Sequence, residues 1–192
     1  SGSSTTDTSN GTVVTSFSEL TAAVTKAEKA GGGIVYVKGS SISCTAQLAL
    51  KASNANVSII GVKNSDGTYP VLDFSAFRSA YIGKATTDSE VGIRISGSNY
   101  TIKNLIIQKA PDNGIQIKGS SAGNNTIENC IVRYNNDAGV QITGGAYSNT
   151  MRFVYSYRNC DVYTLGGNAD GFAPGNGCCV CGLIMRLATF SA

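Results

Sequence analysis

An internal repeat of about 25 residues is the feature that most restricts what this chain can fold into. The segment Thr-Ile-Lys-Asn-Leu-Ile-Ile starts at Thr101, and similar segments start at Thr126, 25 residues later (126 − 101), and at Thr150, 24 residues after that (150 − 126). A second string, Asp-Asn-Gly-Ile-Gln-Ile from Asp112, returns from Asp137 as Asp-Ala-Gly-Val-Gln-Ile, again with a spacing of 25 (137 − 112). A fixed period of this length indicates stacked units, each unable to bury its apolar face alone.

Each repeat has the pattern of short strands joined by turns. Apolar residues alternate with polar ones at Ile115 and Ile117 and again at Val140 and Ile142, which predicts strands with one buried face. Clusters of Gly, Asn and Ser separate these runs and favour turns over helix. We therefore predict an all-β fold, a parallel β-helix of about five or six coils that spans residues 16–174.

Asn104 and Asn129 occupy equivalent places in two successive repeats. Stacked side-chain amides at such places can form hydrogen bonds from coil to coil. Both residues can also be turn residues that tolerate the left-handed backbone conformation. The sequence leaves these two interpretations open.

The two ends of the chain depart from the repeat. Ser16 and Glu19 match a capping box, so we predict a helix from about Phe17 to Lys29 that covers the N-terminal end of the stack, after a flexible lead-in of residues 1–15. Residues 175–192 form an atypical apolar tail. We expect this tail to cover the last coil or to mediate self-association with a second chain.

Two further segments interrupt the repeat. Residues 78–90 are expected to form a loop that projects from the coil. Gly139 finds its counterpart at Gly171 and not near position 164, so residues 160–168 are expected to loop out of the stack. An insertion of this kind in a solenoid commonly lines a binding face.

Composition excludes several kinds of chemistry. The chain contains no histidine, which removes every mechanism that needs an imidazole base. Its net charge of +3 is mild and its basic residues are spread along the repeats, so we expect no nucleic-acid partner. No apolar run approaches the ~18 residues that cross a membrane, so no membrane partner is expected. Cys130 is expected to be a buried free thiol, and a metal site at residues 178–181 is a weaker alternative.

Three strings within residues 91–174 carry a family resemblance: Asn-Thr-Ile-Glu-Asn-Cys from Asn125, Asn-Asp-Ala-Gly-Val-Gln-Ile from Asn136, and Asn-Ala-Asp-Gly-Phe-Ala-Pro from Asn168. Together they resemble polysaccharide lyase family 9, the pectate lyases with a right-handed β-helix. The third string is the most specific of the three. The resemblance implies a right-handed coil, a secreted protein, and Ca²⁺-dependent β-elimination of polygalacturonate, the acidic chain of pectin.

The same resemblance implies that Asp170 is a Ca²⁺ ligand, because it matches the Asp of the family's Ala-Asp-Gly-Phe string. Calcium takes six to eight oxygen ligands, and Asp137 and Asp161 are the other carboxylates that could lie near Asp170. The acidic cluster and the lysine base that the family carries further along do not follow Pro174. We therefore expect a truncated lyase domain with weak or no activity, and we assign no catalytic residue.

An alternative of a different class is a non-catalytic β-helix that binds acidic polysaccharide through basic side chains. The residues chosen for substrate binding are Lys109, Arg133 and Arg158, and the wider basic set adds Lys103, Lys118 and Arg152. A solvated surface explains the same residues without any ligand, and a purely structural solenoid is a third interpretation.

Overall fold

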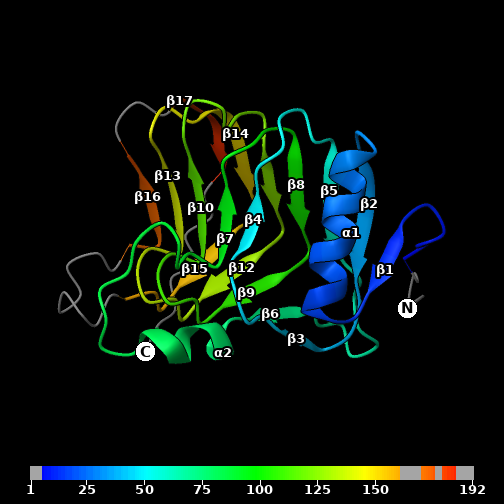
Figure 1. Cartoon of the computed structure of the whole chain (residues 1–192), viewed down its shortest axis with the longest axis horizontal. Helices are drawn as coiled ribbons and strands as arrows, with labels where there is room; N and C mark the ends of the chain where they lie inside the picture. Colours follow the sequence, from blue (N-terminus) through cyan, green and yellow to red (C-terminus); the bar gives the residue numbers. More distant parts are fainter. Residues whose placement is uncertain (1–5, 161–169, 176–178, 185–192) are drawn as a thin grey trace.

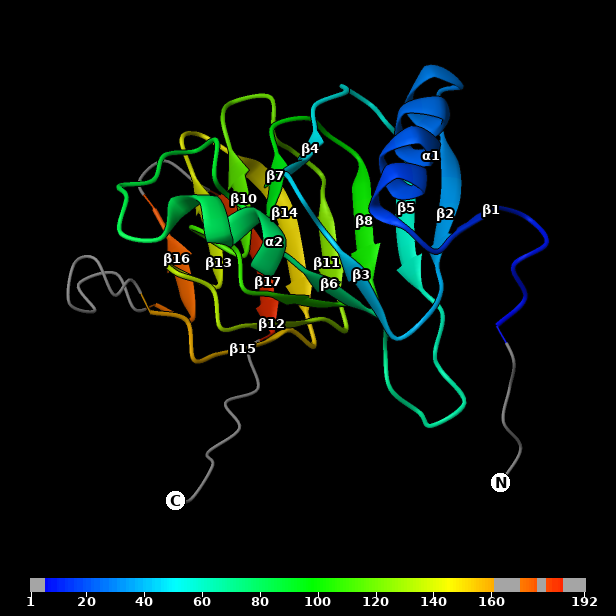
Figure 2. The same ribbon diagram turned by 60° about the horizontal axis from the view of Figure 1, so that its bottom comes forward.

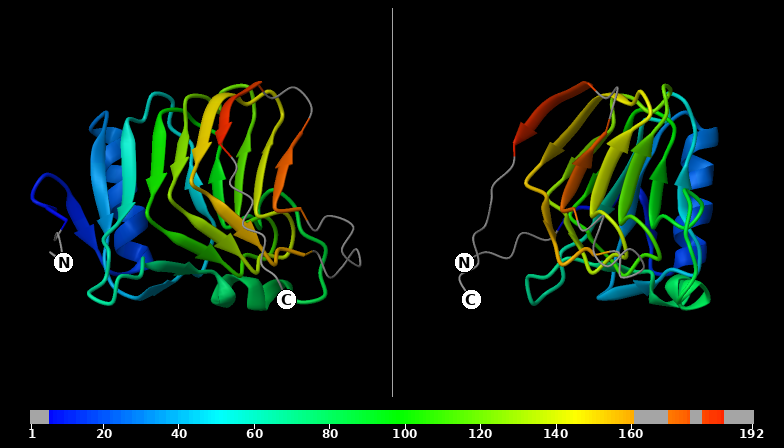
Figure 3. Two further views of the ribbon diagram at one scale, coloured as in Figure 1. Left: turned by 180° about the vertical axis from the view of Figure 1, so that it is seen from behind. Right: turned by 90° about the vertical axis from the view of Figure 1, so that its left-hand side faces the viewer.

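The computed structural model describes residues 6–160, 170–175 and 179–184, the last segment by its backbone alone. The chain winds into a right-handed β-helix whose wall consists of three parallel sheets (Figure 1). Five successive coils each contribute one strand to every sheet, in agreement with the expected five or six coils. Viewed along the stack, the three sheets enclose one interior (Figure 3, right).

The three sheets are called A, B and C here. Sheet A contains β1 (Thr12–Val14), β2 (Gly33–Val37), β5 (Val57–Gly61), β8 (Tyr100–Lys103), β11 (Thr126–Glu128), β14 (Tyr147–Arg152) and β17 (Cys179–Ile184). Sheet B contains β3 (Ser41–Ser43), β6 (Val71–Asp73), β9 (Ile106–Gln108), β12 (Ile131–Arg133) and β15 (Tyr155–Tyr157). Sheet C contains β4 (Leu48–Leu50), β7 (Ile93–Ile95), β10 (Ile115–Lys118), β13 (Val140–Thr143) and β16 (Phe172–Pro174). Sheet A lies at the back of Figure 1 and faces the viewer in Figure 3, left.

The strand register follows the sequence repeat. Ile115 lies beside Val140 and Ile117 beside Ile142, and each of the four is at most 1% exposed. Thr126 pairs with Thr101 on one side and with Thr150 on the other. The predicted inward-facing positions are therefore confirmed.

The glycine of the Asp-x-Gly string is required by close packing at the start of sheet C. A Cβ atom on Gly114 would lie 2.4 Å from Val132 Cγ1 and 2.5 Å from Asn135 Nδ2. Any larger residue would force the coils apart. Gly139 makes equally close contacts one coil later, with Ser156 and Asn159.

Both interpretations of Asn104 and Asn129 are correct. Their φ angles are +58° and +51°, so both residues are left-handed, and the Asn129 amide donates to Asn104 Oδ1 at 2.7 Å. Two fully internal ladders were not predicted. In one of them Asn135 Nδ2 donates to Asn159 Oδ1 at 2.9 Å, and in the other Asn125 Nδ2 donates to Asn149 Oδ1 at 3.0 Å.

Helix α1 (Phe17–Lys29) has the predicted bounds and stands at the N-terminal end of the stack beside β2 and β5 (Figure 1). Leu20, Ala23 and Val24 are buried in the main core, so the helix covers that end. The Ser16 hydroxyl accepts from the Glu19 amide at 3.3 Å, as a capping box requires. The Glu19 carboxylate accepts chiefly from the Thr15 amide, at 2.8 Å.

The lead-in also differs from the expectation, because Thr12–Val14 form β1 and pair with β2. The loop between β6 and β7 begins with α2 (Ser75–Arg78) and the 3₁₀ helix η1 (Ser79–Tyr81), which lie over the corner between sheets B and C (Figure 2). It does not simply project from the coil, since Asp88 lies against the outer face of sheet C.

The later interruption has the predicted size. Val140 pairs with Phe172, so Gly139 does align with Gly171, and the extra residues lie between β15 and β16. Residues 161–169 fall outside the described part of the chain. In the tail, residues 179–184 form β17, which pairs in parallel with β14 through an irregular register and continues sheet A. Within the described residues, no helix combines the length and apolar character that crossing a membrane requires.

Candidate functional site

The structure brings Lys109, Arg133 and Arg158 together at the corner between sheets B and C. Lys109, Tyr134 and Arg158 occupy the same turn position on three successive coils, directly after β9, β12 and β15. Their φ angles are +59°, +57° and +52°, so all three turns share one left-handed conformation. Arg133 is the last residue of β12, directly before Tyr134, and lies on the same surface.

Tyr134 is at the centre of this group. The guanidinium carbons of Arg133 and Arg158 lie 5.5 and 5.8 Å from its ring centroid, which is the geometry of cation–π contacts. Arg158 Nη1 also donates to the Tyr134 hydroxyl at 3.0 Å, and Arg133 Nη1 donates to the Tyr157 hydroxyl at 3.1 Å. We name this surface the cation–tyrosine cluster, and it contains Arg78, Lys109, Arg133, Tyr134, Tyr157 and Arg158.

Arg78 was not among the predicted site residues, and it reaches the cluster from α2. Its two terminal nitrogens donate to the Tyr134 carbonyl at 3.0 Å and to Asn136 Oδ1 at 2.8 Å. These bonds fasten α2 to the fourth coil. No periodic signal in the sequence could have placed Arg78 here. Tyr134, in contrast, was detectable, because it lies 25 residues after Lys109 (134 − 109) and in the same turn.

The six basic residues predicted to bind an acidic ligand differ in whether an acidic side chain pairs with them. Lys103 and Arg152 both form ion pairs with Glu128 on sheet A, and Lys118 forms one with Asp88 on sheet C. Lys109 Nζ lies 3.3 Å from Asp73 Oδ2. Within the part of the chain that the structure describes, Arg133 and Arg158 form no ion pair.

Asp73 is held ionised at the edge of the cluster. Its partial burial opposes ionisation, but hydrogen bonds from Ser75, Gln108 and Lys109 together keep the pKa of Asp73 below its ordinary value. Gln108 Nε2 donates to Asp73 at 2.7 Å, and Gln108 Oε1 accepts from Arg133 Nε at 2.9 Å. Gln108 thus bridges Asp73 and Arg133, and Asp73 forms no direct ion pair with Arg133.

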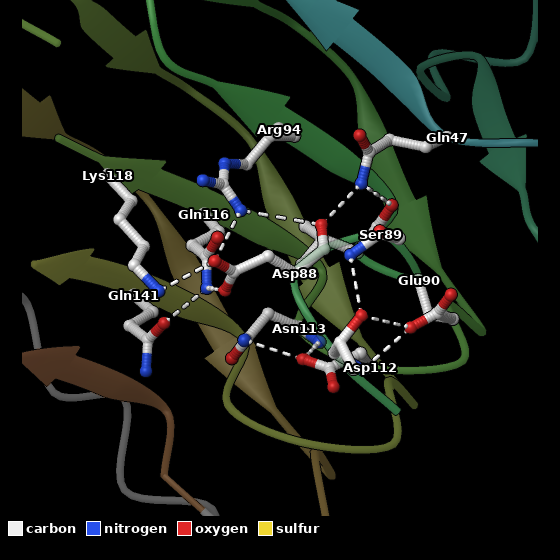
Figure 4. A network of polar contacts seen from close by, with 12 residues as sticks. Gln47, Asp88, Ser89, Glu90, Arg94, Asp112, Asn113, Gln116, Lys118 and Gln141 are labelled. Carbon is white, nitrogen blue, oxygen red and sulfur yellow. Dashed lines mark hydrogen bonds and ion pairs between the residues drawn. The ribbon is translucent and has the colours of Figure 1, made fainter. Parts of the chain in front are cut away.

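A second polar surface lies on the outer face of sheet C (Figure 4). The Asp88 carboxylate accepts from Arg94 at 3.1 Å, from Lys118 at 2.6 Å and from Gln116 at 3.0 Å. Partial burial opposes ionisation here too, but these three donors lower the pKa of Asp88 to about 2. The contacts of Asp88 were not predicted, because the loop that carries it is outside the repeat.

Asp112 and Asn113 are buried together in the turn between β9 of sheet B and β10 of sheet C. Asn113 donates to Asp112 Oδ1 from its backbone and its side chain, each at 2.7 Å. Burial raises the pKa of Asp112, the nearby charges of Glu90 and Asp88 raise it further, and hydrogen bonds from Thr86 and Asn113 oppose the rise. Asp112 therefore belongs to the interior of the turn and not to an exposed ligand set.

Asp170, the predicted Ca²⁺ ligand, precedes β16 of sheet C. It is exposed at the start of β16, and its carbonyl accepts from the Gly139 amide at 2.9 Å. Among the described residues, no three acidic or cysteine side chains gather in a way that could hold a metal ion. Asp161 lies outside the described residues, so the role of Asp170 as a Ca²⁺ ligand stays a prediction.

The free thiols fit their predicted role in part. Cys130 is 1% exposed, and burial raises its pKa to about 12, as it does for Cys44. Cys160 is free and exposed. The side chains of Cys178, Cys179 and Cys181 lie outside the described part of the chain, so the alternative of a metal site there stays untested.

Comparison with known proteins gives three matches. The family model described as the Pel9A-like, right-handed β-helix region matches residues 2–181. Pectate lyase L of Paenibacillus polymyxa (strain SC2) is 32% identical over 94 residues, which are 48% of this chain and 19% of that protein. The crystal structure of pectate lyase Pel9A matches with a TM-score of 0.62 and 23% identity, over 84% of this chain and 40% of the other. The chain thus spans less than half the length of either protein.

Proposed function

Because the chain belongs to the family of Pel9A-like proteins with a right-handed β-helix, we propose that it binds acidic plant polysaccharide, polygalacturonate in particular, as the β-helix part of a pectate-lyase-type protein. Pectate lyases are the relatives of known activity, and each is longer than this chain. Pectin is a component of the plant cell wall, so the proposed place of action is outside the cell.

The observation that carries this proposal is the pair of guanidinium groups that flank Tyr134 without an ion-pair partner in the described residues. Arg133 and Arg158 are held in place by tyrosine hydroxyls and by the Tyr134 ring. A planar guanidinium matches the two oxygens of a carboxylate, and its charge is wholly available when no acid is paired with it.

The spacing of the cluster also suits a repeating acidic chain. Adjacent coils lie about 4.8 Å apart, so side chains at one turn position form a row that runs along the stack. Lys109, Tyr134 and Arg158 form such a row, with a charge at either end and an aromatic ring between them. An extended polyuronate presents a carboxylate on every sugar and can contact such a row at several points.

We assign binding and not the chemical step to the described residues. Abstraction of the C5 proton of a uronate needs a base, and the family adds Ca²⁺ to offset the charge on the carboxylate. Asp170 is the one proposed Ca²⁺ ligand here, and the described residues contain no group of three acidic or cysteine side chains that could hold a metal ion. We therefore propose that this chain alone turns over polygalacturonate at a negligible rate. A purely non-catalytic binding module is the second candidate, favoured by the same unpaired arginines.

Binding is tested by calorimetric titration of a galacturonate oligomer into the chain and into R133Q/R158Q. Each charge-assisted hydrogen bond contributes about 1.5–3 kcal/mol, so the double variant should bind at least about tenfold more weakly. K29Q/R152Q is the matched control. It also removes two positive charges, but from helix α1 and sheet A, away from the cluster. Equal affinities for the wild-type chain and R133Q/R158Q would exclude the cluster as the binding site.

The chemical step is tested by ultraviolet detection of unsaturated product from polygalacturonate with added Ca²⁺. We expect no release above the uncatalysed rate. Ca²⁺-dependent release that Asp170→Ala abolishes would show instead that Asp170 belongs to a working metal site.

A further inference from the structure

The acidic side chain that lies on sheet C comes from a loop, whereas every group that binds it comes from the β-helix wall. Arg94 is on β7, Gln116 and Lys118 are on β10, and Asp88 belongs to the segment between η1 and β7 (Figure 4). We propose that these three wall residues form a second site for a uronate carboxylate, and that Asp88 occupies this site when no ligand is bound. This inference rests on the proposed function, because it assigns a further subsite for the same class of ligand.

The three donors are arranged as a carboxylate receptor. Lys118 and Arg94 both point at Asp88 Oδ2, and the Gln116 amide points at Oδ1, so each oxygen of the carboxylate has a donor of its own. The donors lie on neighbouring strands whose backbones pair in register. Their positions are therefore fixed by the sheet and do not depend on the loop.

An unpartnered acceptor indicates that the ligand carries hydroxyl groups as well. Gln116 is 3% exposed, and its Nε2 donates both to Asp88 and to Gln141 Oε1. Gln116 Oε1 has no hydrogen-bond partner among the described residues. A carboxylate cannot donate to it, so Asp88 leaves this buried oxygen unsatisfied. A sugar, whose hydroxyls can donate, is able to satisfy it.

A pocket continues the site beside Asp88. It has a volume of about 280 Å³ and is lined by Gln47, Lys51, Asp88, Ser89, Arg94 and Ser96. Drug-sized ligands fill pockets of roughly 300–1,000 Å³, so this volume corresponds to a smaller unit such as one sugar ring. Lys51 adds a third cation to Arg94 and Lys118, and Asp88 is the one acid in the lining.

The loop can leave the sheet without uncovering a large apolar area. Residues 82–85 and Ser89 are exposed, and Ile82 is 78% exposed. Apart from the carboxylate contacts, the Asp88 backbone is held by its carbonyl, which accepts from Gln47 at 2.8 Å and from Arg94 at 3.4 Å. An anion of the same charge can therefore replace Asp88 at moderate cost.

An internal competitor reduces the apparent affinity to the intrinsic affinity multiplied by the fraction of time that the site is free. If Asp88 occupies the site about nine-tenths of the time, its removal raises the affinity about tenfold. We therefore expect Asp88→Asn, which keeps the shape and removes the charge, to bind trigalacturonate about tenfold more tightly than the wild-type chain. The affinity for a neutral galactose trimer should stay the same in both.

Glu90→Gln is the matched control, because it removes one negative charge from the same loop. The Glu90 carboxylate accepts from the Thr87 amide and hydroxyl and forms no ion pair with Arg94 or Lys118. This control should bind like the wild-type chain. Adding Lys118→Met to Asp88→Asn should cancel the gain, since it removes one of the donors that a carboxylate would contact.

The proposed function and this inference fail in different ways. R133Q/R158Q weakens binding at the cation–tyrosine cluster, but the ratio of affinities between Asp88→Asn and its parent should persist in that background. The inference is overturned if Asp88→Asn gains no affinity, or gains as much for the neutral trimer, because Asp88 then only holds the loop against the sheet.

Should Asp88→Asn fail to fold, hydrogen exchange on the wild-type chain tests the inference instead. Saturating trigalacturonate should speed amide exchange at residues 87–90, and unchanged exchange would contradict displacement of the loop.

Discussion

Buried asparagines replace strand pairing at the corners of this β-helix. Asn135 Oδ1 accepts from the Ala110 amide at 2.9 Å, and Asn159 Oδ1 accepts from the Asn135 amide at 3.0 Å. Asn159 Nδ2 then donates to the Val132 carbonyl at 3.2 Å. Each side chain thus satisfies backbone groups that the turn has removed from the sheets, where an unpaired buried group would be costly. This explains why Asn recurs at the corners while apolar residues recur on the strands.

The cysteines give a prediction at the scale of single residues. Burial raises the pKa of Cys44 and of Cys130 to about 12, so both stay protonated near neutral pH, and the thiolate is the reactive form. Cys160 is exposed. We expect iodoacetamide at about pH 8 to modify Cys160 in the folded chain and to leave Cys44 and Cys130 intact until urea is added. Peptide mass spectrometry measures this. Modification of Cys130 at the rate of Cys160 in native buffer would show that the core opens readily.

At the scale of single residues, the 24–25-residue period indicates which side chains are neighbours, and segments outside the period give no such information. Lys109 and Arg158 could be placed on one surface because a 24–25-residue period puts equivalent residues side by side. The same period links Asn135 with Asn159, yet the sequence does not reveal which turn residues face inward. Arg78 and Asp88 come from a loop without a repeat, so their contacts depend on how that loop folds back. No local pattern encodes such a path.

The inward row of sheet C gives a prediction at the scale of the element. Ile142 is 1% exposed and lies between Ile117 and Pro174 in the register. Truncation to alanine leaves a cavity in a layer that the rigid neighbouring coils cannot fill. We expect Ile142→Ala to lower the free energy of unfolding by about 2–5 kcal/mol, measured by urea denaturation. Thr143→Ala, which changes the next and partly exposed residue of β13, should cost much less. An unchanged thermal midpoint for Ile142→Ala would contradict its placement in the core.

Sheet A carries an ion triad across three strands. Lys103 on β8 and Arg152 on β14 both contact Glu128 on β11, with distances of 2.8 Å from Lys103 Nζ and 2.7 Å from Arg152 Nε. The bond from Lys103, and then that from Arg152, hold the pKa of Glu128 below its ordinary value of 4.5 despite partial burial. A folded-state pKa below the unfolded value means that the charged form stabilises the fold. That contribution is complete above the unfolded value and is lost as the pH falls through the folded one.

We therefore expect Glu128→Gln to be less stable than the wild-type chain at pH 7. The difference should be modest, about 0.2–1 kcal/mol for each pair, because both cations are well exposed to solvent. It should shrink at about pH 3, where the unfolded chain is mostly protonated at this residue. Urea denaturation at both pH values measures it. About 1 M salt should reduce the difference at pH 7, and a difference that is the same at both pH values would show a packing effect and no ion-pair contribution.

At the scale of the whole molecule, the chain behaves as a stack in which each coil contacts its neighbours. The period, the strand pattern and the capping box were enough to predict the β-helix, its coil number and the bounds of α1. They were enough because each signal is local or repeats at fixed spacing. The last strand was not predicted. Residues 179–184 lack the Thr-Ile-x-Asn string, and their pairing with β14 shifts register twice.

The final prediction concerns this last strand. β17 pairs with β14, so removing it exposes the backbone donors and acceptors of β14 as an open edge, which is a template for pairing with another chain. We expect deletion of residues 178–192 to lower the thermal midpoint and to cause concentration-dependent association, measured by light scattering after size-exclusion chromatography. Deletion of residues 185–192 alone is the matched control, because it leaves β17 in place. This shorter deletion should cause less association than the longer one. If the longer deletion stays monomeric with an unchanged midpoint, the edge of β14 is protected by other means, and β17 contributes little to the stability of the stack.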